Sequence, residues 1–228
     1  MEQLHNGFTL ELCHGAFPFS TDSMVLSDFV RLPRQANVLD LGAGCGTLGL
    51  LLCAKDTACT VTGVEIDENA HRMALHNSLV NGISSRLSSI CADLRTVSSF
   101  ITPGSFHCCV SNPPYFSAGQ LSANSVARHE QLCSLDELFS AAAWSVRYGG
   151  DFFLVHKPER LAQLCACAVN HKLEPKRLLL LRHRPGDPVN LIFLQCRKGA
   201  KPGLTIEEES LQDVSGKPSA YYRKIYHI

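Results

Sequence analysis

The chain has 228 residues, a formal net charge of zero, a pI near 7.1 and a hydrophobic fraction of 45%. This length suits one large domain or one domain with a small appendage, and the zero net charge excludes a surface coated in positive charge while allowing a local basic patch. No apolar run of about 18 residues occurs, and the N-terminus lacks a basic-then-apolar signal pattern, so we expect a cytoplasmic protein with no membrane segment.

The 11 cysteines are scattered along the chain, and none of them forms a C-x-x-C pair. That distribution argues against a disulfide framework and against a zinc site, and it fits cysteine used as a small hydrophobe in a reducing compartment. We therefore expect no metal. The sequence leaves the oligomeric state open.

Strand-like apolar runs alternate with helical stretches from about residue 36 onward. Thr21 and Asp22 open the first helix, and Asn81-Gly82 ends the third. Ser134 is the expected N-cap of the fourth. Helices are expected at 24–30, 46–55, 67–82 and 134–150, and strands at 37–42, 59–65, 86–93, 106–112, 151–157, 177–182 and 189–197.

Strands alternating with helices of this length predict an α/β fold with a mostly parallel sheet covered on both faces. The last two strands are joined by the link "HRPGDP", which is too short for a parallel crossover, so they should run antiparallel. Such a sheet is unlike a dinucleotide-binding sheet. Three parts are expected: a lead-in with one helix at 1–35, the α/β domain at 36–198, and a tail of irregular coil at 199–228.

A glycine-rich turn, "VLDLGAGCGTLG", follows the first strand. Gly44, Gly46 and Gly49 can be read as G-x-G-x-x-G, a weak signal for a nicotinamide or flavin cofactor, but that motif starts right at the strand end so that pyrophosphate meets bare N–H groups. Here Asp40 lies at the strand end. Its carboxylate would repel a pyrophosphate but suits a ligand that carries an ammonium group and a sulfonium, such as S-adenosylmethionine.

Polar residues also end the next three strands. Glu65 ends the second strand, about 20 residues past the turn, where a carboxylate can accept from both ribose hydroxyls. Asp93 ends the third, placed to accept from an adenine amino group while Leu94 offers a backbone N–H, and Asn112 ends the fourth. Any one acid is equally a helix N-cap. Four such residues in succession indicate one ligand site, because open parallel sheets bind ligands at the carboxyl ends of their strands.

The motifs "DLGAGCG", "GVEID", "CAD" and "NPPY", in this order and spacing, resemble those of the class I S-adenosylmethionine-dependent methyltransferases across about residues 36–197. The resemblance implies a Rossmann-like sheet of seven strands, mostly parallel with an antiparallel last strand, and helices on both faces. It also implies a set of S-adenosylmethionine-binding residues: Asp40, Gly42, Ala43, Gly44, Gly46, Glu65, Ile66, Asp93, Leu94 and Asn112.

The segment "VSNPPYF" places Asn112, Pro113, Pro114 and Tyr115 behind the fourth strand. The exocyclic amine of adenine is a poor nucleophile because its lone pair is delocalised into the ring. Asn112 Oδ1 and the Pro113 carbonyl can accept its two hydrogens, the prolines fix that carbonyl towards the site, and Tyr115 offers a face for a flipped-out base. These four residues are the expected catalytic set. In isolation the same residues would indicate only a structural turn.

The flanking segments "FSTDSMVLSDFV", "ARHEQLCSLDEL" and "KLEPKRLLLLRHRPGDPVNLIFLQCRKGAKPGL" are similar to those of the bacterial tRNA1(Val) adenine-N6 methyltransferases. That resemblance implies a tRNA substrate, methylated at the adenine beside the anticodon. It also implies that the helix opened by Thr21 and Asp22 closes over the cofactor. For His129 and Glu130, a local salt bridge is as good an interpretation as a catalytic role. The residues expected to contact RNA are Arg128, Lys157, Arg182 and Arg184.

Asn-Pro-Pro-Tyr alone does not name the methyl acceptor, since it also occurs in enzymes that act on DNA adenine, on guanine N2 of ribosomal RNA and on a glutamine of release factors. The glutamine enzymes carry a helical domain before the glycine turn, and DNA enzymes usually add a target-recognition domain; residues 1–35 and 199–228 are too short for either. The alternatives left open are guanine-N2 methylation of ribosomal RNA and a non-catalytic module that binds S-adenosylmethionine.

Overall fold

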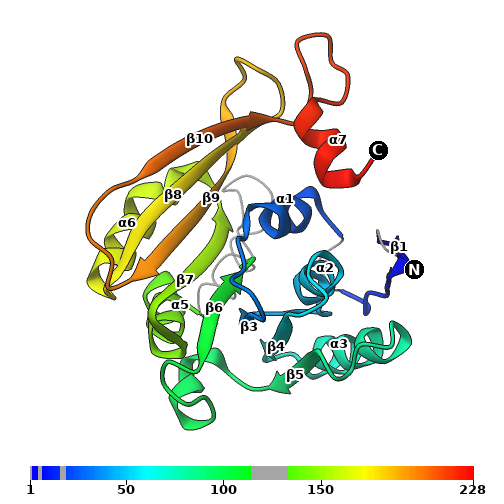
Figure 1. Cartoon of the computed structure of the whole chain (residues 1–228), viewed down its shortest axis with the longest axis vertical. Coiled ribbons are helices and arrows are strands. Elements are labelled where there is room, and N and C mark those ends of the chain that lie inside the picture. Colours follow the sequence, from blue (N-terminus) through cyan, green and yellow to red (C-terminus); the bar gives the residue numbers. More distant parts are fainter. Residues whose placement is uncertain (1, 5–6, 16–18, 114–132) are drawn as a thin grey trace.

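A computed structural model describes residues 2–4, 7–15, 19–113 and 133–228, and its centre is one sheet of eight strands (Figure 1). The spatial order is β10-β8-β9-β7-β6-β3-β4-β5. The strands are β3 (Asn37–Leu41), β4 (Thr60–Glu65), β5 (Leu87–Cys91), β6 (Phe106–Ser111), β7 (Val146–His156), β8 (Leu173–Arg182), β9 (Val189–Lys198) and β10 (Thr205–Ser210), with β1 (Glu2–Gln3) and β2 (Thr9–Leu10) forming a separate antiparallel pair. The helices are α1 (Thr21–Phe29), α2 (Thr47–Lys55), α3 (Glu68–Val80), α5 (Leu135–Ser145), α6 (Leu161–Asn170) and α7 (Ala220–Tyr226), with the 3₁₀ helices η2 (Leu94–Ser99) and η3 (Pro158–Arg160).

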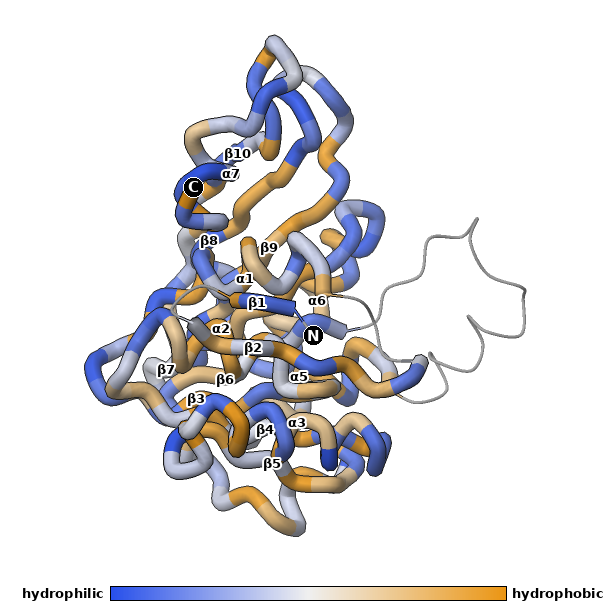
Figure 2. The backbone as a smooth tube through the Cα atoms, turned by 90° about the vertical axis from the view of Figure 1, so that its right-hand side faces the viewer, coloured by the Kyte–Doolittle hydropathy of each residue, from blue (hydrophilic) through white to orange (hydrophobic). Residues whose placement is uncertain are grey.

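Helices cover both faces of the sheet because neighbouring strand residues point to opposite sides. On one face, Phe29 of α1 meets Phe153 of β7 edge-on, with ring centroids 6.1 Å apart. On the other face, Phe139 of α5 meets Phe152 of the same strand in the same way, at 5.2 Å. Figure 2 shows apolar residues along β8 and β9 and mostly hydrophilic ones in the loops beyond them. The predicted α/β sheet with two covered faces is confirmed.

The C-terminal part of the chain differs from the prediction in two respects, the number of strands and the structure after residue 198. β9 pairs antiparallel with both β8 and β7, as the short link predicts. The expectations of seven strands and of irregular coil after residue 198 are wrong, because β10 lies parallel to the outer edge of β8 and α7 follows it. Its sequence, "TIEEES", is poor in the residues that favour strands. Its position is set by the free backbone groups of β8 and by Arg177, which donates to Glu207 at 2.8 and 3.1 Å.

The helix α5 begins where expected and ends early. Ser134 Oγ accepts from the backbone N–H of Glu137, whose carboxylate accepts from the Ser134 N–H in return, so the predicted N-cap is confirmed as a capping box. The predicted helix end at residues 149–150 is wrong, since β7 already begins at Val146. Gly150 instead allows β6 and β7 to pack closely, because a Cβ at this position would lie 2.6 Å from the carbonyl oxygen of His107.

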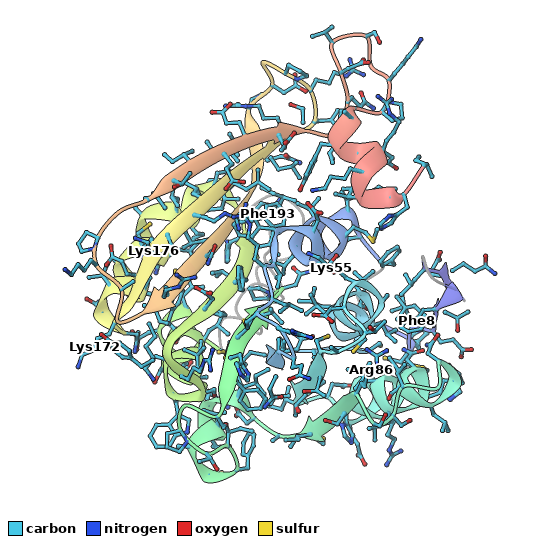
Figure 3. All side chains as sticks on the ribbon, viewed as in Figure 1. Phe8, Lys55, Arg86, Lys172, Lys176 and Phe193 are labelled. Carbon is cyan, nitrogen blue, oxygen red and sulfur yellow. The ribbon has the colours of Figure 1, made fainter. Side chains whose placement is uncertain are left out.

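The helix α1, predicted from its Thr-Asp start, is fastened at its far end by α2. Lys55 donates from Nζ to the carbonyl oxygens of Ser27, Asp28 and Val30 at 2.7, 3.0 and 2.8 Å. Figure 3 shows Lys55 between the two helices. Carbonyl groups at a helix C-terminus lack partners within the helix and favour a nearby positive charge. One side chain thereby caps α1 and ties it to the body of the domain.

Within the described ranges, no helix has both the length and the apolar character that crossing a bilayer requires.

Candidate active site

The candidate site lies where the carboxyl ends of β3, β4 and β6 meet. These three strands are adjacent and parallel, with Asp40 of β3 opposite Gly63 of β4 and Val110 of β6. The glycine turn follows β3, Glu65 ends β4 and Asn112 follows β6. The fold therefore brings Asp40, Glu65 and Asn112 together at the carboxyl edge of the sheet, and Asp93 follows β5 at the same edge, beside Glu65.

The glycine turn is held by the backbone of the neighbouring strand. Gly42 N and Ala43 N both donate to the carbonyl oxygen of Val64, at 2.9 and 3.1 Å. Gly42, Gly44 and Gly46 have φ angles of 79°, 54° and 82°, which are strained for any residue with a Cβ. Apart from its chain neighbours, a Cβ on Gly42 or Gly44 would meet no atom of the described residues within 4 Å, which leaves space there for a ligand.

Glu65 joins that turn to the next helix. Its Oε2 accepts from Gly44 N and its Oε1 from Asp67 N, both at 2.8 Å. Asp67 in turn caps α3 by accepting from Ala70 N at 2.8 Å. Each carboxylate oxygen of Glu65 retains capacity for a further hydrogen bond. The next side chain, Ile66, is 49% exposed, which leaves an apolar surface beside a carboxylate at the edge of the site.

Asp40 is the most unusual group at this edge. Only 2% of the residue is exposed, and among the described residues its Oδ2 has no hydrogen-bond partner. Burial, reinforced by the negative charge of Glu65, raises the pKa of Asp40 to about 7. A buried carboxyl oxygen without a donor is costly, so it marks a place where an N–H group or a cationic ligand would be favourable.

Asp93 and Leu94 lie beyond the end of β5, which stops at Cys91 rather than at Asp93 as expected. Asp93 caps η2, accepts from Arg95 N at 2.9 Å, and forms an ion pair with the Arg95 side chain through Nε at 2.8 and 3.0 Å. That pairing lowers the pKa of Asp93. Leu94 packs, partly buried, against the apolar cluster that contains Phe139 and Phe152. A hydrogen bond from an adenine amino group to Asp93 stays a prediction, and it would have to share an already paired carboxylate.

Asn112 is held between β6 and α1. Its Nδ2 donates to Ser23 Oγ of α1 at 3.0 Å. The preceding residue, Ser111, is fully buried and donates from Oγ to the carbonyl oxygen of Leu41 at 2.7 Å. Pro113 is half-buried. Pro114 and Tyr115 lie outside the described residues, so the expected stacking face stays a prediction.

The start of α1 lies against the C-terminal helix and near the end of β7. Thr21 Oγ1 and the hydroxyl of Tyr226 in α7 share a hydrogen bond of 2.9 Å. Burial raises the pKa of Asp22, and the positive charge of Lys157 opposes that shift. Thr21 and Asp22 therefore lie where α1 meets α7 and the end of β7, two elements from the C-terminal half of the chain.

The residues expected to contact RNA have partners within the protein. Lys157 Nζ lies 3.4 Å from the Asn190 carbonyl oxygen. Arg182 donates to the carbonyl oxygen of Asp187 at 2.5 Å and lies 3.7 Å from a carboxylate oxygen of Glu208. Arg184 donates to Gln212 Oε1 at 2.7 Å and, through its backbone N–H, to Asp187. Arg128, His129 and Glu130 lie outside the described residues.

Two residues of this site gave no signal in the sequence analysis. One is Ser23, which contacts Asn112. The other is the fully buried Asn77 of α3, whose Nδ2 donates to the carbonyl oxygen of Cys45 in the glycine turn at 2.9 Å. Asn77 Nδ2 also donates to the carbonyl oxygen of Glu11, and its Oδ1 accepts from Glu11 N. Both contacts join residues far apart in sequence, so no local pattern reveals them.

A parallel sheet interrupted by one antiparallel strand, a glycine turn after β3 and an acid at the end of β4 define the class I S-adenosylmethionine-dependent methyltransferases. In the described part of the chain, no group of three or more His, Cys, Asp or Glu side chains is arranged to hold a metal ion. The family model for the methyltransferase small domain matches residues 17–165. The chain belongs to this methyltransferase small domain family.

Curated relatives match a larger share of the chain than the family model does. A tRNA1(Val) (adenine(37)-N6)-methyltransferase from Bacteroides fragilis (strain YCH46) is 30% identical over 176 residues, covering 76% of this chain and 74% of that protein. A protein of the same name from Shewanella sp. (strain W3-18-1) is 29% identical over 217 residues, covering 92% of this chain and 89% of the other.

Solved structures share the fold. A predicted O-methyltransferase from Agrobacterium tumefaciens matches with a TM-score of 0.76 at 21% identity, covering 91% of this chain and 96% of that one. A geranyl diphosphate methyltransferase in complex with S-adenosylmethionine matches with a TM-score of 0.56 at 11% identity, covering 77% and 84%. The protein is an S-adenosylmethionine-dependent methyltransferase.

Proposed function

We propose that this enzyme transfers the methyl group of S-adenosylmethionine to the exocyclic N6 amine of an adenine in tRNA, at the adenine beside the anticodon of a valine tRNA. The observation that carries the proposal is the Asn112-Pro113 segment, which follows β6 directly beside the glycine turn and whose carboxamide is held by α1. The names of the curated relatives support the same reaction.

The residues around the glycine turn fit S-adenosylmethionine. Asp40 has a buried oxygen without a donor, which an ammonium group would satisfy. Glu65 has acceptor capacity left for ribose hydroxyls, and the exposed Ile66 offers an apolar face to adenine. Further contacts are proposed from Gly42, Ala43, Gly44 and Gly46 of the turn, from Thr21 and Asp22 of α1, and from Asp93, Leu94 and Asn112. When bound, S-adenosylmethionine supplies an electrophilic methyl group on its sulfonium.

Asn112 and Pro113 act on the acceptor amine. No described residue donates to Asn112 Oδ1, so this oxygen is free to accept one amine hydrogen, and the Pro113 carbonyl accepts the other. Accepting both hydrogens favours a pyramidal nitrogen whose lone pair points to the methyl group, and this interaction strengthens as the bond forms. The nitrogen loses its proton after transfer because the methylated ammonium is strongly acidic. In this proposal Pro114 and Tyr115 complete the site, Tyr115 by stacking on the base.

Lys157, Arg182 and Arg184 are proposed to bind the phosphate backbone of the tRNA, together with Arg128. Lys157 follows β7, and Arg182 ends β8, which runs parallel to β7 through their shared antiparallel neighbour β9. Both therefore lie at the carboxyl edge of the sheet, on the same side as Asn112. Lys157 contacts a carbonyl oxygen, and Arg182 contacts a carbonyl and a carboxylate oxygen; the charged phosphate oxygens of RNA are alternative acceptors for both side chains.

The test is methyl transfer to RNA made without modifications. The purified protein is incubated with labelled S-adenosylmethionine and either valine tRNA or ribosomal RNA, and the product nucleosides are identified by mass spectrometry. We expect N6-methyladenosine from the tRNA and about a 10²–10³-fold slower single-turnover rate for Asn112→Ala, by analogy with the loss of one oxyanion-hole donor. N2-methylguanosine from the ribosomal RNA, or no transfer to either RNA, would contradict the proposal.

A further inference from the structure

The hydrogen bond between Ser23 and Asn112 links α1 to the residue proposed to activate the acceptor amine. We infer that Ser23 is a positioning residue, which fixes the orientation of the Asn112 carboxamide so that Oδ1 rather than Nδ2 meets the acceptor. The inference rests on the proposed function for its chemistry. It adds a residue outside both the glycine turn and the Asn-Pro-Pro-Tyr segment.

Orientation matters because the two ends of a carboxamide have opposite roles. Oδ1 only accepts hydrogen bonds, and Nδ2 only donates them. The amine that receives the methyl group presents N–H donors. A carboxamide turned by 180° would place its own N–H donors against them and give no activation. In the structure Ser23 Oγ accepts from Nδ2 at 3.0 Å, so the bond holds the carboxamide in place with Nδ2 towards α1 and leaves Oδ1 for the amine.

Ser23 is suited to this role because it is buried on a helix that is fixed at both ends. The residue is 7% exposed, so water competes weakly for the hydrogen bond. At the start of α1, Thr21 is bonded to Tyr226 of α7. At its end, Asp28 pairs with Lys224 of α7 at 3.0 Å, and Lys55 caps the last carbonyl groups. The Oγ therefore has a fixed position relative to the sheet.

A second buried serine of the same helix shows what a purely local role looks like. Ser27, 8% exposed, donates from Oγ to the carbonyl oxygen of Met24 at 2.8 Å, which is a bond within its own helix. It lies one helical turn beyond Ser23. Ser27→Ala is therefore a matched control for the loss of a buried hydroxyl from α1.

The experiment compares Ser23→Ala, Ser23→Thr and Ser27→Ala with the unaltered protein. We expect Ser23→Ala to slow single-turnover methyl transfer about fivefold to tenfold, which is the effect of one hydrogen bond, with unchanged affinity for S-adenosylmethionine and unchanged KM for tRNA. Ser23→Thr keeps the hydroxyl and should restore the rate, and Ser27→Ala should transfer methyl normally. A normal rate for Ser23→Ala, or equal losses in Ser23→Ala and Ser23→Thr, would overturn the inference.

A spectroscopic readout separates this inference from the proposed function. The side-chain amide signal of Asn112 in a ¹⁵N–¹H spectrum is identified by its loss in Asn112→Ala. It should shift in Ser23→Ala and stay in place in Ser27→Ala. If the unaltered protein fails to methylate tRNA, the proposed function is contradicted, and the Asn112 amide signal alone tests the role of Ser23. A shift of that signal in Ser23→Ala supports the hydrogen bond, and an unmoved signal overturns the inference.

Discussion

Two regions of the sheet treat charged groups in opposite ways. The glycine-turn edge is where β3, β4 and β6 end, and the C-terminal edge is formed by the outer strands β8 and β10. At the glycine turn, Asp40 is buried with an oxygen for which the described part of the chain supplies no donor. Along β8 and β10, Arg177 pairs with Glu207 and Arg182 with Glu208, so the basic residues there are compensated by acids of the neighbouring strand. An unpartnered buried carboxyl indicates a ligand site more strongly than paired surface arginines indicate an RNA site, because proteins rarely leave buried polar groups unsatisfied.

The largest effect on cofactor binding is expected at Glu65, whose two oxygens accept from Gly44 N and Asp67 N and are proposed to bind the cofactor. Glu65→Ala should weaken S-adenosylmethionine binding by about 1.5–3 kcal/mol, roughly 10- to 150-fold, the range for hydrogen bonds to a charged group. Glu65→Gln keeps one acceptor oxygen, so its affinity for S-adenosylmethionine should lie between those of the unaltered protein and Glu65→Ala. Titration calorimetry measures the dissociation constants. An unchanged value for Glu65→Ala would leave the glutamate with only its structural bonds to Gly44 and Asp67.

A pH-dependent affinity is expected from Asp40. Its pKa is raised to about 7, so the carboxyl is increasingly neutral as the pH falls below that value. A cationic ligand favours the ionised form, so binding must release a proton, and affinity should fall by up to about tenfold per pH unit well below pH 7. Calorimetry between pH 6 and 7.5, in buffers of different ionisation enthalpy, reports both the affinity and the proton.

The control for this prediction is Asp40→Asn, whose side chain cannot ionise. Its affinity should be weaker at pH 7.5 and nearly independent of pH over the same range. A pH dependence that survives in Asp40→Asn would show that another group titrates and would break the contrast between the two edges.

A smaller effect is expected from the basic residues of the C-terminal edge. The double change Arg182→Glu and Arg184→Glu should weaken tRNA binding several-fold. The plot of log affinity against log salt concentration should also become less steep, by about 0.7–0.9 for each of at most two lost phosphate contacts. Cofactor affinity should not change. The matched control is Lys172→Glu with Lys176→Glu, the same charge change at the opposite end of β8, where Figure 3 shows both lysines far from α1.

Equal losses from the two double variants would indicate a general effect of net charge rather than a binding surface at Arg182 and Arg184. Thermal unfolding of each variant is needed beside the binding curves, since Arg182 also bonds to the loop carbonyl of Asp187.

The smallest expected effect tests whether the two edges are coupled through α7. Tyr226→Phe keeps the ring, which stacks on Tyr222 with centroids 4.4 Å apart, and removes the hydrogen bond to Thr21. We expect a loss of about 0.5–1.5 kcal/mol in the free energy of unfolding, measured with urea. Tyr222→Phe is the control and should cost less. Equal stabilities for the two variants would mean that the Thr21 bond contributes nothing.

The sequence by itself determined those features that depend on local backbone chemistry. The glycines after β3 need positive φ angles, the Ser134-Glu137 pair forms a capping box, and a short link requires antiparallel strands. Each of these rules acts over a few residues, so each can be recognised without knowing the fold. The parallel sheet follows from the alternation of strands and helices for the same reason.

Only the tertiary structure decided which residues meet. It placed the acidic β10 on β8, left the Asp40 oxygen without a donor from the residues that the structure describes, and brought Ser23 of α1 to Asn112 beyond β6. These contacts join segments far apart in the chain, so no periodicity or capping pattern encodes them. Their physical basis is burial: a polar group removed from water must find its partner among whichever residues the packed chain places beside it.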